Sequence, residues 1–129
     1  MSHIIYLHYK LIYPLFGNNA KILVCGLAFK GEPPTSDLRD SPAVEIYKFF
    51  ESSFDNTLAF DPVIDPSTLA QNDISPTYDD FYNSCNDLDC LVILNNHSFF
   101  KEIDFGIVQE KASKNLPLRK LPKESLLDI

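Results

Sequence analysis

The chain has 129 residues, of which 45% are hydrophobic and 22% are charged. These proportions are typical of one globular domain, and they exclude a disordered chain, a collagen-like repeat and a coiled coil. The 11 Lys and Arg residues against 18 Asp and Glu residues give a net charge of −7, which argues against a general nucleic-acid or anionic-membrane surface. The apolar stretches also fall short of the roughly 20 residues that span a bilayer. We therefore expect neither nucleic acid nor a membrane as a partner.

Three cysteines occur, Cys25, Cys85 and Cys90, and their spacing is not that of a zinc site. No other cluster in the sequence resembles a set of metal ligands. We therefore expect no metal, and we expect reduced thiols, which are typical of a cytoplasmic protein.

Residues 1–20 do not resemble the beginning of a compact domain. Apolar residues recur at helical spacing between Ile4 and Ile12, and Pro14 then interrupts the pattern. This pattern predicts a helical lead-in, or the remnant of a preceding segment, followed by one domain over residues 21–129.

Apolar runs alternate with helical patterns along this domain. The run from Lys21 to Phe29 is typical of a strand buried on both faces. Ser41 and Pro42 then predict the N-cap and the first residue of a helix that ends at Asp55. Further strands are expected at 57–60, 90–94 and 125–129, and further helices near 66–71, 79–85 and 104–112.

This alternation predicts an α/β fold. Right-handed connections between the strands produce a parallel sheet with helices on both faces. Ligands of such folds bind at the carboxyl ends of the strands. Here these ends carry Phe29-Lys30-Gly31, Asp61-Pro62 and Asn95-Asn96-His97.

The common phosphate-binding and catalytic motifs are missing from the sequence. Gly26 and Gly31 have the spacing of a P-loop, but Glu32 and Pro33 stand where that motif needs Lys and Ser or Thr. The sequence contains no G-x-G-x-x-G and no recognisable pairing of a Ser or Cys nucleophile with a His. The residues alone therefore do not predict an enzyme that is complete within this chain.

Residues 26–46, GLAFKGEPPTSDLRDSPAVEI, carry a more specific signal. They resemble the C-terminal UDP-binding domain of the UDP-glucose/GDP-mannose dehydrogenase family, in which the first strand ends in G-[LF]-[AT]-F-K and a loop D-[LT]-R-[ED]-S-[PS]-A opens a helix. The resemblance continues at 59–62 (AFDP) and 89–101 (DCLVILNNHSFFK). Within it, the H-x-x-F pattern is more similar to the 6-dehydrogenases of UDP-N-acetylmannosamine and UDP-N-acetylglucosamine. The matching positions of the first motif are Phe29, Lys30, Asp37, Arg39, Ser41, Pro42 and Ala43.

The resemblance implies a Rossmann-like three-layer αβα sandwich. It also implies a role in an NAD-dependent dehydrogenase that makes a UDP-uronic acid for polysaccharide biosynthesis. Phe29 and Lys30 would line the UDP-sugar pocket, with His97 as a neighbour. Arg39 would reach NAD that is bound by another domain. The implied partners are the UDP-sugar and the N-terminal NAD-binding and central dimerisation domains of a homodimeric enzyme.

The resemblance assigns no catalytic residue to this chain. The catalytic cysteine of the family lies in a G-G-x-C-x-P motif that this sequence lacks, so none of its cysteines inherits that role. The family's last strand leads into D-x-[RK], and residues 126–129 match only its beginning. We therefore expect a truncated UDP-sugar-binding domain that is inactive by itself.

Each of these residues also has a purely structural interpretation. Apart from the resemblance, Lys30 is a solvated charge at a strand end, Arg39 a member of a loop ion pair, and His97 a loop histidine. Asp61 then caps a turn. The alternative function is a stand-alone, non-catalytic α/β binding or regulatory module, which would not bind UDP. A receiver-like version needs a phosphoacceptor Asp and an acidic pair, for which Asp61 and Asp79-Asp80 stand in the wrong order.

Overall fold

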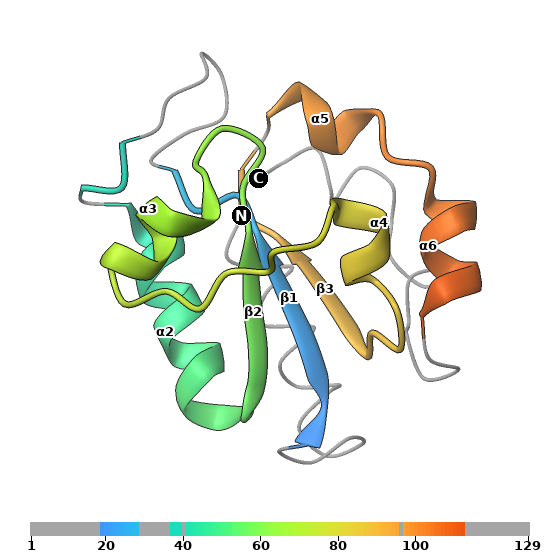
Figure 1. The fold of residues 1–129 in the computed structure, drawn as a ribbon, viewed down its shortest axis with the longest axis horizontal. Coiled ribbons are helices and arrows are strands. Elements are labelled where there is room, and N and C mark those ends of the chain that lie inside the picture. The colour runs from blue at the N-terminus through green and yellow to red at the C-terminus, as the bar shows by residue number, and fades with distance from the viewer. Residues whose placement is uncertain (1–18, 29–36, 40, 96, 113–129) are drawn as a thin grey trace.

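Three parallel strands form the centre of the structure (Figure 1). The computed structural model describes residues 19–28, 37–39, 41–95 and 97–112. The sheet has the order β2-β1-β3, formed by β1 (Lys21–Cys25), β2 (Asn56–Phe60) and β3 (Cys90–Ile93). Val24 of β1 lies opposite Ala59 of β2 and Val92 of β3. Because β1 is the central strand, every residue after its first is buried, as the apolar run predicts.

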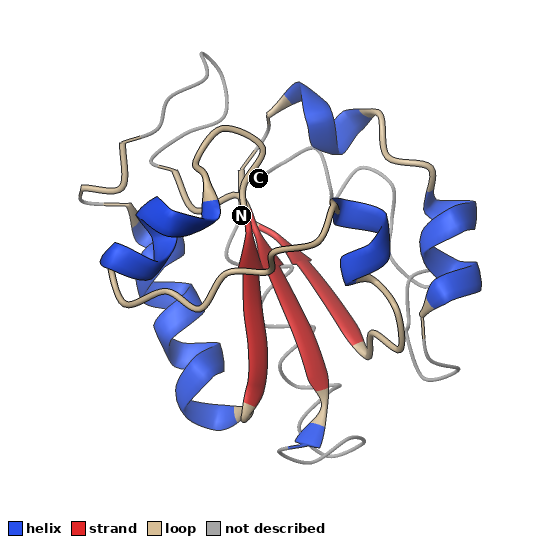
Figure 2. Cartoon of the chain, in the orientation of Figure 1, coloured by secondary structure: helices blue, strands red, loops and turns tan. Residues whose placement is uncertain are grey.

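Helices cover both faces of the sheet (Figure 2). One face carries α2 (Pro42–Ser53) and α3 (Pro66–Gln71), and the other carries α4 (Phe81–Ser84), α5 (Ser98–Lys101) and α6 (Phe105–Lys111). Successive residues of a strand point to opposite faces. Ile22 and Val24 therefore join the core beneath α2 and α3, whereas Leu23 and Cys25 join the core beneath the other three helices. This is the predicted Rossmann-like, three-layer α/β architecture.

Helix α2 forms for the reasons that the sequence predicts. Pro42 occupies its first turn, where a missing N–H has no consequence. Glu45 places a negative charge near the positive end of the helix dipole. Ala43, Tyr47 and Phe50 form the buried face, and their spacing follows the helical period.

The strand predicted over residues 21–29 ends at Cys25. The cause is Gly26, whose φ of 84° lies in the left-handed region and interrupts the extended backbone. Leu27 and Ala28 are nevertheless fully buried. Their apolar character therefore reflects burial in the turn after β1 and not continued strand structure.

The helices predicted near 66–71, 79–85 and 104–112 are confirmed as α3, α4 and α6. Helix α5 has only four residues, which is too short to show a hydrophobic period, so the sequence pattern did not predict it. The predicted lead-in within residues 1–20 and the predicted strand over 125–129 lie outside the described residues. No helix in the described part of the chain has the length and apolar character needed to traverse a bilayer.

Candidate functional site

The residues that follow the three strands lie at one edge of the sheet, at the top of Figure 1. We call this the carboxyl edge. Its described parts are the turn after β1 (Gly26–Ala28), the loop that begins at Asp61 after β2, and Asn95 and His97 after β3. Ser41, at the start of α2, lies at the same edge because its side chain contacts Leu27.

The Asp61 carboxylate connects two loops of the carboxyl edge. Its Oδ2 accepts hydrogen bonds from the N–H groups of Leu27 at 2.9 Å and Ala28 at 3.2 Å. Its Oδ1 accepts hydrogen bonds from Val63 at 2.8 Å and Ile64 at 3.1 Å. The side chain is only 8% exposed. The predicted role in capping a turn is thus confirmed, and the contacts to the turn after β1 extend it.

Ser41 corrects one detail of the predicted helix start. It occupies the N-cap position of α2, but its side chain makes no capping bond to the helix. Instead, the buried Oγ donates to the Leu27 carbonyl at 2.8 Å. The serine therefore ties the first turn of α2 to the turn after β1, which the local sequence pattern does not reveal.

Asn95 packs directly against Gly26. A Cβ added to Gly26 would lie 2.8 Å from the Asn95 Cγ and 2.9 Å from its Oδ1, so only glycine fits this contact. The Asn95 Oδ1 also accepts a hydrogen bond from the His97 N–H at 3.1 Å. The buried amide therefore places the loop after β3 against the turn after β1.

His97 begins helix α5. Its Nδ1 accepts a hydrogen bond from the Phe99 N–H at 3.0 Å, which makes the ring the N-cap of that helix. When the imidazole is neutral, its proton is therefore on Nε2. The half-buried ring thus has one N–H donor that this bond does not use, and a phosphate or sugar oxygen is a suitable acceptor for it.

Arg39 lies in the segment before α2 and is highly exposed, at 88% of its side-chain area. Its Nε and Nη2 donate to the two carboxylate oxygens of Asp37, at 3.1 and 3.2 Å. These bonds and the Arg39 backbone N–H lower the pKa of Asp37, and the same carboxylate raises the pKa of Arg39. The pair is the exposed loop ion pair expected from the residues alone, and such pairs exchange readily with solvent or a ligand.

Two predicted site residues, Phe29 and Lys30, lie outside the described residues. Of the others, His97 lies at the carboxyl edge and Arg39 lies in the segment that leads into α2. Within the part of the chain that the structure describes, no three His, Cys, Asp or Glu side chains are close enough together to hold a metal ion.

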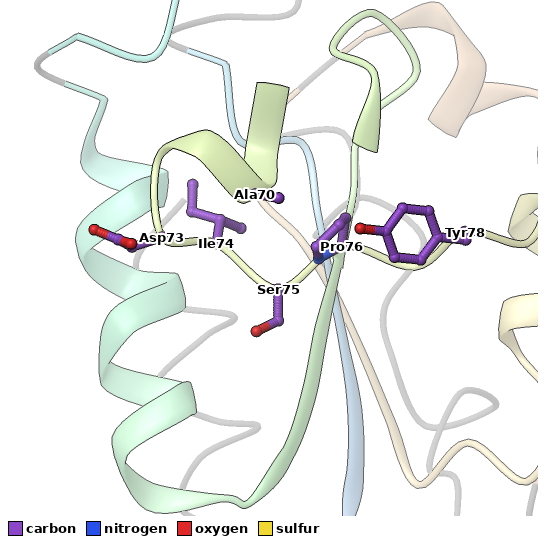
Figure 3. Close-up of a pocket in the computed structure, with 6 residues that line it drawn as sticks. All are labelled: Ala70, Asp73, Ile74, Ser75, Pro76 and Tyr78. Carbon is purple, nitrogen blue, oxygen red and sulfur yellow. The ribbon is translucent and has the colours of Figure 1, made fainter. Parts of the chain in front are cut away.

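A hollow of about 480 Å³ opens on another part of the surface, beside the segment that pairs with β2 (Figure 3). Neither Arg39 nor His97 lines it. Its lining residues in the described part of the chain are Ala70, Asp73, Ile74, Ser75, Pro76 and Tyr78.

Sequence reasoning missed the contacts that organise the carboxyl edge. Local patterns identify Ser41 as a helix cap, Asp61 as a turn cap and Asn95 as part of a loop. The partner of Ser41 is 14 residues away along the sequence, and the partner of Asp61 is 34 residues away. Such pairings depend on which strands become neighbours, and no local pattern records them.

The comparison with protein families identifies the domain. The model of the UDP-glucose/GDP-mannose dehydrogenase family, UDP binding domain, matches residues 23–119. A comparison with curated protein sequences finds no match.

Several solved structures share the fold. The UDP-D-ManNAc dehydrogenase of Pyrococcus horikoshii is 23% identical with a TM-score of 0.69, over 86% of this chain and 24% of that one. A derivative structure of the UDP-N-acetyl-mannosamine dehydrogenase of Staphylococcus aureus is 26% identical with a TM-score of 0.65, over 89% of this chain and 26% of that one. The native structure of that enzyme is 24% identical with a TM-score of 0.64, over 89% and 27%.

This chain therefore spans about a quarter of the length of the dehydrogenases that it resembles. The family match covers most of the chain, and it includes all the described strands except the first two residues of β1. The chain thus belongs to the UDP-glucose/GDP-mannose dehydrogenase family, and residues 23–119 are its UDP binding domain.

Proposed function

We propose that this chain is the nucleotide-sugar-binding domain of an NAD-dependent 6-dehydrogenase that acts on UDP-N-acetylmannosamine or UDP-N-acetylglucosamine. The observation that carries this proposal is the family match over residues 23–119. Two further observations support an N-acetylhexosamine as the sugar. The similar solved structures are described as UDP-N-acetylmannosamine dehydrogenases, and the sequence has H-x-x-F at His97 to Phe100.

In this proposal, Lys30 and His97 bind the UDP-sugar, and Phe29 lines the pocket beside them. The chain has a net charge of −7 and so repels a diphosphate overall. Local donors must therefore supply the attraction. The Lys30 ammonium is a mobile point charge suited to a phosphate or sugar oxygen. The Nε2–H of His97 is a second donor, held in place by the bond between Nδ1 and Phe99.

Arg39 is proposed to contact NAD that is held mainly by the N-terminal domain of the complete enzyme. Bound NAD would act as the hydride acceptor for the oxidation of the sugar. The exposed guanidinium fits such a contact, because a group that reaches toward another domain must project from its own. Asp37 accepts two hydrogen bonds from the guanidinium, and because the pair is exposed, a phosphate or amide oxygen can replace the carboxylate there.

The remaining parts of the enzyme are proposed to come from outside this chain, because the chain covers about a quarter of similar dehydrogenases. An N-terminal NAD-binding domain would supply the catalytic cysteine, and a central domain would join two subunits in a homodimer. The proposed location is the cytoplasm, where the three thiols would stay reduced. The product would be a UDP-uronic acid for polysaccharide biosynthesis.

The direct test is calorimetric titration of the chain with UDP, with uridine as the comparison ligand. We expect UDP to bind and uridine to bind more weakly, because the diphosphate carries the charge that Lys30 recognises. A chain that binds no UDP would contradict the proposal and favour a stand-alone α/β module.

A kinetic test uses the full-length enzyme. We expect Lys30→Ala to lower kcat/KM for the UDP-sugar at least tenfold, which corresponds to about 1.4 kcal/mol. In the same series, Arg39→Ala should raise the KM for NAD. The charge-matched control is Lys111→Ala, because the Lys111 carbonyl accepts from the Asp87 N–H at 2.9 Å near the start of β3, at the opposite edge of the sheet. Unchanged kinetics for Lys30→Ala would remove this residue from the site.

A further inference from the structure

The Gly26–Ala28 turn is held by buried polar side chains from three different elements. Asp61 follows β2, Asn95 follows β3, and Ser41 precedes α2. The turn comes immediately before Phe29 and Lys30 in the sequence, which are the two residues proposed to meet the UDP-sugar. The turn also contacts Asn95, whose Oδ1 accepts from the His97 N–H, so it is linked to a described residue of the proposed site.

Asp61 makes the strongest of these contacts. It is the acceptor for the consecutive N–H groups of Leu27 and Ala28, at 2.9 and 3.2 Å. Both residues are buried, so without the carboxylate these two N–H groups would lose their acceptor in an environment that excludes water. A charged acceptor also makes stronger hydrogen bonds than a neutral one.

Ser41 and Asn95 hold the turn at two further points. Ser41 donates to the Leu27 carbonyl at 2.8 Å, so the peptide group between Leu27 and Ala28 is held at its oxygen as well as at its N–H. Asn95 packs against the Cα of Gly26, where a Cβ would approach within 2.8 Å. The Gly26 N–H donates to the Phe60 carbonyl at 2.9 Å, which completes the attachment to β2.

We propose that Asp61 is a positioning residue of the nucleotide-sugar site, which holds the Gly26–Ala28 turn against Asn95 and thereby fixes the loop that carries His97. This inference rests on the proposed function of the chain. The physical reason is preorganisation: a loop that is ordered before the ligand arrives does not have to be ordered by the binding energy. Asp61 acts through the backbone of Leu27 and Ala28 and need not touch the ligand.

Asp61→Asn separates the two functions of the carboxylate. An amide keeps one acceptor oxygen and replaces the other with an NH₂ donor. The contacts to Val63 and Ile64 form a local turn, which asparagine also favours, so the amide oxygen is expected to remain there. The NH₂ group then faces the N–H groups of Leu27 and Ala28, and these two bonds are lost.

The test measures UDP affinity by calorimetry and amide hydrogen exchange by NMR on the same folded chain. We expect Asp61→Asn to weaken UDP binding at least tenfold and to accelerate exchange at Leu27 and Ala28 more than at Val63 and Ile64. The matched control is Asp65→Asn. Asp65 is also a capping carboxylate, but its hydrogen bonds among the described residues stay within its own helix, at Thr68 and Ser67.

The outcomes separate the positioning role from the proposed function. If the wild-type chain does not bind UDP, the proposed function fails and the positioning role fails with it. If the wild type binds UDP and folded Asp61→Asn binds within twofold of it, the positioning role alone is refuted, because a purely structural residue lowers Tm without changing the affinity of the folded protein. If Asp61→Asn does not fold, Ser41→Ala carries the test. A threefold or greater loss of affinity is expected, and an unchanged affinity refutes the proposal.

Discussion

Replacing Gly26 with alanine tests how closely the turn after β1 is packed. An alanine at φ 84° occupies the left-handed region, which costs about 1–2 kcal/mol for a residue with a Cβ. The new Cβ would also lie 2.8 Å from the Asn95 Cγ, and overpacking of this kind costs about 1–3 kcal/mol. Alanine also lowers the conformational entropy of the unfolded chain, which stabilises the folded state by about 0.4–1 kcal/mol. The net expected loss of unfolding free energy is therefore about 1–5 kcal/mol.

The assay is urea unfolding followed by circular dichroism, with a second substitution to isolate the steric part. Asn95→Ala removes Cγ and Oδ1, the two side-chain atoms nearest to the new Cβ, and leaves the backbone N at 3.0 Å. The double mutant should therefore show a favourable coupling of about 1 kcal/mol or more, while the cost of the left-handed φ remains. Gly106→Ala is the control for the backbone term, because Gly106 lies in helix α6 without a left-handed φ, and its added Cβ would lie 3.1 Å from an exposed side-chain atom, the Asp104 Oδ1.

The reasoning is refuted if Gly26→Ala loses less than about 1 kcal/mol, since neither the φ angle nor the contact with Asn95 would then be as restrictive as the geometry requires. It is also refuted if the two substitutions act additively. Additive effects would mean that the Asn95 side chain moves aside without cost.

Two further predictions concern buried hydroxyl and thiol groups. Tyr47→Phe should lower the free energy of unfolding by about 1–3 kcal/mol in urea titrations, because the buried hydroxyl accepts from the Ser75 N–H at 2.8 Å; Tyr78→Phe, at a side chain that is 77% exposed, should have no effect. Burial raises the pKa of Cys85 from 9.0 to about 11, so the folded state keeps a proton that the unfolded state releases. Between about pH 9 and 11, this thiol should therefore lower the free energy of unfolding by about 1.4 kcal/mol per pH unit. Cys85→Ala should remove this contribution from the slope of unfolding free energy against pH. An unchanged slope would contradict the burial of the thiol.

Local sequence patterns predicted the family, the described strands and every described helix except α5. The apolar run of β1 predicted a strand buried on both faces, because such a strand has no polar side. The Ser41-Pro42 pair located the start of α2, since the first turn of a helix needs no N–H from proline. The motif over residues 26–46 indicated the dehydrogenase family, which the match over residues 23–119 confirmed. All these signals are local, so a single sequence contains them.

The assembly of the carboxyl edge depends on contacts that appear only in the folded chain. Strand β1 ends at Cys25 because Gly26 adopts a left-handed φ. The missing Cβ of Gly26 also lets Asn95, in the loop after β3, pack against its backbone. In the folded chain, the Ser41 hydroxyl donates to the Leu27 carbonyl and does not cap its own helix. Folding also gives Asp61 partners in two loops. Each of these contacts joins segments that become neighbours only when three parallel strands align, and a pattern along the chain contains no information about that alignment.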